Sequence, residues 1–95
     1  MAIKLKPSHT SAHYNLGIAL FAKKKNEEAI SHYKRAIRLN PDFAYAHYNL
    51  GLVLFQKGRV KEAIHHFRET LRVKPNLNAA RNYLKFALLR LKKLE

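Results

Sequence analysis

Residues 13–17 read His-Tyr-Asn-Leu-Gly, and the same five residues return 34 positions later, at 47–51. The three prolines, Pro7, Pro41 and Pro75, keep the same interval. When residues 10–43 are aligned with residues 44–77, 15 of the 34 positions are identical. A tandem repeat of this period is typical of helical solenoids, in which each unit buries its apolar side against the next.

Each unit carries the apolar spacing of two helices. Leu16 and Leu20 are four residues apart, and Ile30, Tyr33 and Ile37 follow in steps of three and four, which is the period of a helix with one buried stripe. The pattern lapses at 23–26 and again at 57–59, where we expect turns. We therefore predict an all-α fold with no strand and about five helices, at roughly 9–22, 26–39, 42–56, 60–73 and 77–93.

The junction between the two units contains Asn40 followed by Pro41. Asparagine is a good N-cap, and proline is tolerated at the first helical position because its missing N–H would be unpaired there anyway. This pair predicts that the third helix starts at Pro41.

The repeat positions that carry leucines, small residues, aromatic residues and prolines resemble those of the tetratricopeptide (TPR) family. The resemblance covers nearly the whole chain. The matching residues are Leu16, Gly17, Leu20, Ala29, Tyr33, Ala36 and Pro41 in one unit and Leu50, Gly51, Leu54, Gly58, Ala63, Phe67 and Pro75 in the next. The resemblance implies a TPR-type α-solenoid with two helix-turn-helix repeats, 10–43 and 44–77, and a C-terminal solvating helix, 78–95. Lys85 replaces Gly17 and Gly51 in that last helix, which we expect only where no partner helix approaches.

The first nine residues resemble the end of a preceding repeat, because Ala2 to Pro7 align with Ala36 to Pro41. We therefore expect residues 1–9 to be a remnant of such a repeat and the chain to be the C-terminal part of a longer array. A first helix without its neighbour exposes an apolar face, which favours association.

The resemblance also implies a peptide-binding groove, lined by the first helix of each unit and by the closing helix. The predicted groove is apolar and aromatic, and Asn15 and Asn49 are expected to bind the backbone of a partner peptide. The alternative is that some of its aromatic side chains pack against the next repeat, with Phe21 and Phe55 the first candidates. The groove residues are Tyr14, Asn15, Ile18, Phe21, Tyr45, Tyr48, Asn49, Leu52, Phe55, Asn82, Phe86 and Leu89.

The chain carries a formal net charge of +13 and has a pI near 10.4. Many of its cations fall near corresponding helix ends, so stacking of the repeats should gather them along one side. Such a basic edge can attract nucleic acid or an anionic membrane, although a solvated surface is the favoured interpretation because no aromatic residues are interleaved with the cations. The basic edge is Lys23, Lys24, Lys25, Lys57, Arg59, Lys61, Lys92 and Lys93.

No catalytic or cofactor motif is present. The chain has no cysteine and no glycine-rich phosphate loop. His9 and His13 have a spacing that can chelate a metal. However, His13 recurs as His47 and His32 recurs as His66, so packing within the repeats is the favoured role of these histidines. We expect no enzyme activity, no cofactor, no metal and no small-molecule substrate.

The predicted function is that of a protein–protein interaction scaffold that binds an apolar or aromatic peptide or helix in its groove. The same groove could also be filled by a second copy of the chain, which would form a homodimer. Binding of nucleic acid or an anionic membrane through the basic edge is the alternative. No apolar run reaches the 18 residues of a membrane helix, and the first residues are too short for a signal peptide. The sequence indicates no compartment, the cytoplasm being the default expectation.

Overall fold

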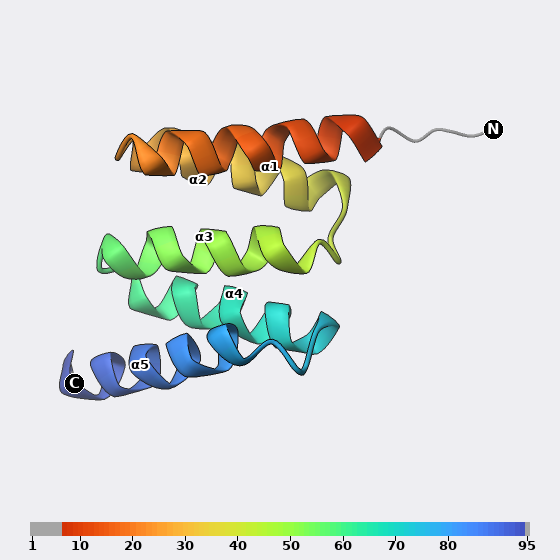
Figure 1. Cartoon of the computed structure of the whole chain (residues 1–95). Coiled ribbons are helices and arrows are strands. Elements are labelled where there is room, and N and C mark those ends of the chain that lie inside the picture. Colours follow the sequence, from red (N-terminus) through yellow and green to blue (C-terminus); the bar gives the residue numbers. More distant parts are fainter. Residues whose placement is uncertain (1–6, 95) are drawn as a thin grey trace.

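The computed structural model describes residues 7–94, which form five α-helices in a stack (Figure 1). Successive helices run antiparallel, and α1, α3 and α5 form a nearer layer with α2 and α4 behind them (Figure 1). No strand occurs among residues 7–94, so the all-α prediction is confirmed. The helices are α1 (Pro7–Ala22), α2 (Asn26–Leu39), α3 (Ala44–Gln56), α4 (Val60–Val73) and α5 (Asn78–Leu94).

The five helix ranges predicted from the apolar spacing agree with the observed ones to within two residues at every end. Residues 1–6 of the predicted 1–9 remnant lie outside the described residues, and residues 7–9 belong to α1. No helix between residues 7 and 94 has both the length and the apolar character needed to cross a membrane.

The predicted start of the third helix at Pro41 is wrong. Asn40 caps the C-terminus of α2 instead, and its backbone N–H donates to the Ala36 carbonyl over 2.9 Å. The Asn40 side-chain oxygen accepts a hydrogen bond of 3.2 Å from the Asp42 N–H, which closes a turn before α3 begins at Ala44. Proline is also common just after a helix C-terminus because it cannot continue the helix, and this preference prevails here.

Both hairpin turns use a residue with positive φ at the same repeat position. Gly58 has φ +81° between α3 and α4, and Lys24 has φ +63° between α1 and α2. The N–H of the next residue then returns to the preceding helix, Lys25 to the Leu20 carbonyl at 2.8 Å and Arg59 to the Leu54 carbonyl at 2.9 Å. These bonds satisfy carbonyls that a helix C-terminus leaves free.

Close contact within each hairpin depends on one glycine. A Cβ on Gly17 would lie 2.5 Å from the ring of Tyr33, and a Cβ on Gly51 would lie 2.6 Å from the ring of Phe67. Both rings are fully buried, so the glycines make room for the largest core side chains. Lys85, at the equivalent position of α5, is exposed, and no helix of the described residues packs over it.

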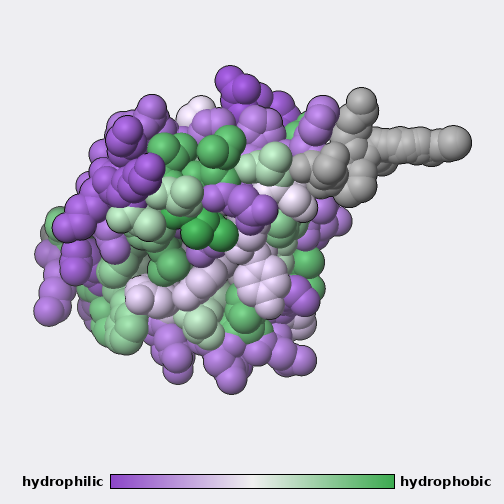
Figure 2. All heavy atoms as spheres, turned by 45° about the horizontal axis from the view of Figure 1, so that its top comes forward, coloured by the Kyte–Doolittle hydropathy of each residue, from purple (hydrophilic) through white to green (hydrophobic). Residues whose placement is uncertain are grey.

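The two units differ in how far their first helix is buried. Leu50 of α3 is completely buried, together with Ala46 and Val53 of the same helix face. The equivalent Leu16 of α1 is 47% exposed, because no described helix covers α1 as α2 covers α3. Figure 2, with the α1 side tilted toward the viewer, shows hydrophobic residues on this side of the stack, bordered at the left by hydrophilic ones.

Candidate functional site

The predicted groove residues come from α1, α3 and α5, the three helices of one layer (Figure 1). Four of them are large apolar or aromatic side chains that remain widely exposed. Phe86 is 55% exposed and Leu89 is 60% exposed on α5, and Ile18 and Tyr45 are each 42% exposed. Water therefore covers apolar surface that a partner can bury.

The remaining large groove residues are only half-buried, because they also pack against the core. These are Tyr14, Phe21, Tyr48, Leu52 and Phe55. The alternative interpretation, packing between repeats, thus holds for Phe21 and Phe55 in part. Their inner sides support the stack, and their outer sides form the floor of the predicted groove.

Tyr83 of α5 lies at the centre of the aromatic residues of the floor. Its ring centre lies 6.0 Å from Phe67, 6.3 Å from both Tyr48 and Phe55, and 5.9 Å from Phe86. Rings at these distances attract one another through their quadrupoles. Asparagine occupies the equivalent position of both repeats, so this ring is particular to α5.

Asn49 makes a contact within the groove floor. Its side-chain nitrogen donates a hydrogen bond of 3.1 Å to the Tyr14 hydroxyl, which links α3 to α1. Burial raises the pKa of the Tyr14 hydroxyl, and the bond from Asn49 partly offsets this rise. Asn15 and Asn82 are exposed.

Two hollows lie between consecutive helices of the groove layer, and their apolar linings are equivalent. The first has a volume of about 590 Å³ and includes Ile18 and Phe21 of α1. The second has a volume of about 290 Å³ and includes Phe86 and Leu89, which occupy the same repeat positions on α5. The first is completed by Ala22, Lys24, Asn26 and Gln56, and the second by Phe55, Arg90 and Lys93.

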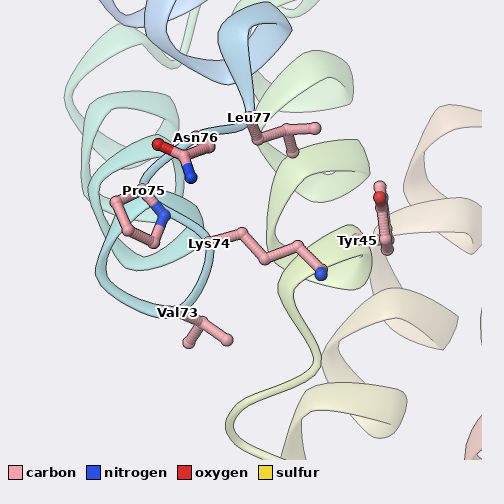
Figure 3. Close-up of a pocket in the computed structure, with 6 residues that line it drawn as sticks. All are labelled: Tyr45, Val73, Lys74, Pro75, Asn76 and Leu77. Atoms are coloured by element: carbon pink, nitrogen blue, oxygen red, sulfur yellow. The ribbon is translucent and has the colours of Figure 1, made fainter.

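Tyr45 lies apart from these two hollows. It borders a third hollow, of about 380 Å³, with Val73 at the end of α4 and with Pro75, Asn76 and Leu77 of the segment between α4 and α5. Figure 3 shows the Lys74 side chain reaching across toward the Tyr45 ring, and its ammonium nitrogen lies 5.7 Å from the ring centre. Tyr45 therefore makes a cation–π contact with Lys74, which the sequence did not indicate.

The basic edge is gathered at one end of the stack. The turns at 23–25 and 57–59 and the last residues of α5 all lie at the left in Figure 1. Two of its cations are neutralised, since Lys57 pairs with Glu27 at 2.6 Å and Arg59 pairs with Glu62 at 2.7 Å. The hydrogen bond from Lys57 lowers the pKa of the Glu27 carboxyl.

Each repeat also contains one pair of histidines between its two helices. The Nδ1 atoms of His13 and His32 lie 3.0 Å apart, as do those of His47 and His66. Burial, followed by the nearby His47, lowers the pKa of His66 to about 4. Within residues 7–94 no group of three or more histidine, cysteine or carboxylate side chains is placed to hold a metal ion.

Two helix hairpins stacked in the same sense, with a fifth helix packed against the second hairpin, define a short α-solenoid. Comparison with protein families places a tetratricopeptide repeat at residues 44–77 and a TPR repeat of a related family at residues 19–58. The chain belongs to the tetratricopeptide repeat family.

Solved structures agree with this assignment. One crystal structure of MamA matches with a TM-score of 0.71 and 32% identity over 88% of this chain and 59% of that one. A crystal structure of the MamA protein matches with a TM-score of 0.75, also at 32% identity and 88% of this chain, and 51% of that one. The chain thus spans between half and three fifths of the length of these structures. No curated protein matches its sequence.

Proposed function

We propose that this chain is a non-catalytic scaffold that binds a protein partner on the groove face formed by α1, α3 and α5. TPR repeats are in general protein-interaction modules. The observation that carries the proposal is the exposure of Phe86 (55%) and Leu89 (60%), which line a hollow together with Phe55. This hollow lies in the layer of α1, α3 and α5, the layer that TPR repeats present to their partners. Each such side chain contributes about 1.5–3 kcal/mol when a partner buries it completely, before ordering costs are subtracted.

Selection of peptides from a random phage-displayed library tests this proposal. The wild-type chain should select peptides that lose binding to a Phe86→Ser/Leu89→Ser variant. Leu16→Ser is the matched control, because Leu16 is also an exposed apolar residue (47%) but lies on the outer face of α1. Selected peptides that bind the groove variant as well as the wild type would contradict the proposal.

Self-association is the second candidate, favoured by the exposure of Leu16, whose equivalent Leu50 is fully buried. A second copy that covers this face would remove the exposed leucine from water. The net charge of +13 opposes contact between copies, so association should strengthen as salt screens the charges. Light scattering should show that the mean molecular mass rises with protein concentration, and that Leu16→Ser abolishes this rise. A monomer at every concentration and salt level would exclude self-association.

A further inference from the structure

The groove layer has an unusual charge composition. Helices α1, α3 and α5 contain no aspartate or glutamate, and the lysines and arginines of this layer all belong to α5. The acidic residues of the described chain lie instead in α2, in α4 and in the turn at Asp42. The charged side chains of the groove layer are therefore all positive.

Three cations border the two hollows. Lys24 lines the hollow between α1 and α3, and Arg90 and Lys93 line the hollow between α3 and α5. None of the ion pairs between described residues involves any of these three. The Arg90 guanidinium carbon lies 5.2 Å from the ring centre of Phe55, so its charge is held directly over the apolar floor.

The hollows therefore repeat one chemical pattern, an apolar lining with a cationic border. A charged side chain placed on Phe86 and Leu89 would lose hydration without gaining a partner, so the lining favours apolar side chains. A carboxylate beside Arg90 or Lys93 gains a charge-assisted hydrogen bond, whereas a lysine or arginine there is repelled.

We infer that the partner is an acidic peptide segment with two bulky apolar side chains, which occupy the two hollows while neighbouring carboxylates face Lys24, Arg90 and Lys93. This inference rests on the proposed function and specifies the partner of that same groove. A nucleic acid would use the same cations through its phosphates, but its binding would not require the exposed side chains of Phe86 and Leu89.

Fluorescence polarisation with a labelled synthetic peptide tests the inference. The probe contains one leucine and one phenylalanine, separated and flanked by aspartates. Two comparison peptides replace either all aspartates by asparagine or both apolar residues by serine. Both replacements should weaken binding, each by about tenfold or more, since a tenfold change corresponds to the loss of about one good contact.

Protein variants locate the contacts. Charge reversal by Arg90→Glu/Lys93→Glu should weaken binding of the aspartate probe about tenfold and leave the asparagine peptide almost unaffected. The matched control is Lys34→Glu/Arg68→Glu, which reverses two exposed charges at equivalent positions of α2 and α4, away from the groove layer. Circular dichroism verifies that each variant keeps the helical content of the wild type.

The outcomes separate this inference from the proposed function. If library peptides bind the groove but the asparagine probe binds as tightly as the aspartate probe, the acidic partner is wrong and the scaffold remains. If charge reversal in the control weakens binding as much as Arg90→Glu/Lys93→Glu, the assignment of these two cations is wrong. Displacement of the probe by a single-stranded oligonucleotide whose own binding is unchanged by Leu89→Ser would favour a nucleic-acid partner and overturn the inference.

Discussion

The Nδ1 atoms of His47 and His66 lie 3.0 Å apart, within hydrogen-bond distance. His47 Nε2 lies 2.9 Å from the Pro41 carbonyl, which can only accept, so the Nε2 of His47 carries its proton. The Nδ1 of neutral His47 is then an acceptor, and His66 donates to it. Protonation of both rings places two N–H donors and two positive charges against each other and breaks the contact.

This pair predicts a loss of stability on acidification. Because the pKa of His66 is about 4 in the folded chain and the usual value is 6.5, the unfolded chain binds a proton in the interval where the folded chain does not. Stability is therefore complete above about pH 6.5 and falls as the pH decreases toward about 4. Besides His47, the groups that influence the pKa of His66 are His65, Lys34 and Glu62.

The measurement is the thermal midpoint at pH 7 and at pH 5. The midpoint of the wild type should be lower at pH 5, by an amount that corresponds to about 1–2 kcal/mol after allowance for partial exposure. His66→Gln should reduce this difference, with the His13–His32 pair of the first repeat left intact. An equal midpoint at both pH values in the wild type would contradict the buried neutral pair.

Truncation of equivalent leucines should have unequal effects in the two repeats. Leu50→Ala leaves a cavity at a site with no exposure, and we expect a loss of about 2–5 kcal/mol of unfolding free energy. Leu16→Ala should cost less than about 1 kcal/mol because that side chain is already half in water. Urea denaturation of both variants measures the difference, and equal losses would show that α1 is covered in solution.

A methyl group on the glycine of the second repeat should destabilise the fold. Gly51→Ala places a Cβ against the buried Phe67 ring, and we expect a loss of about 1–3 kcal/mol from overpacking. The control is Lys85→Ala at the equivalent position of α5, which should change the unfolding free energy by less than about 0.5 kcal/mol. A neutral Gly51→Ala would mean that the two helices can separate without cost.

Lys24 offers a stabilising substitution. Its φ of +63° is costly for a side chain that carries a Cβ, whereas Gly58 serves the equivalent turn. Lys24→Gly should raise the unfolding free energy by about 0.5–1 kcal/mol, and Gly58→Lys should lower it by a similar amount. Denaturation of the two variants measures both changes in unfolding free energy. If both variants are less stable than the wild type, Lys24 makes a contact that stabilises the fold by more than its backbone strain costs.

Most of the fold follows from the spacing of apolar residues and from the 34-residue period. Five helices with the observed bounds were predictable because Leu16, Leu20 and their equivalents in the second unit repeat the same stripe. The beginning of α3 was not, because the Asn40-Pro41 pair is compatible with either end of a helix. Only the hydrogen bonds of the folded turn decide between the two.

The candidate site was predictable in its residues but less so in their roles. Helical spacing placed Phe55, Phe86 and Leu89 on one side of the stack, yet their exposed fractions depend on how far neighbouring helices separate. The contact between Asn49 and Tyr14 joins residues 35 positions apart, and it requires the packing of α1 beside α3. The position of Arg90 over Phe55 depends in the same way on the placement of α5.

Methyl NMR of the chain during titration with the aspartate probe tests the central claim most directly. Ile18 and Leu89 are exposed in the groove layer, and Leu16 and Leu39 are exposed to a similar degree outside it. The account predicts that the methyl signals of Ile18 and Leu89 shift with added peptide and show intermolecular contacts to its leucine and phenylalanine. Shifts confined to Leu16 and Leu39, with Ile18 and Leu89 unchanged at saturation, would contradict it.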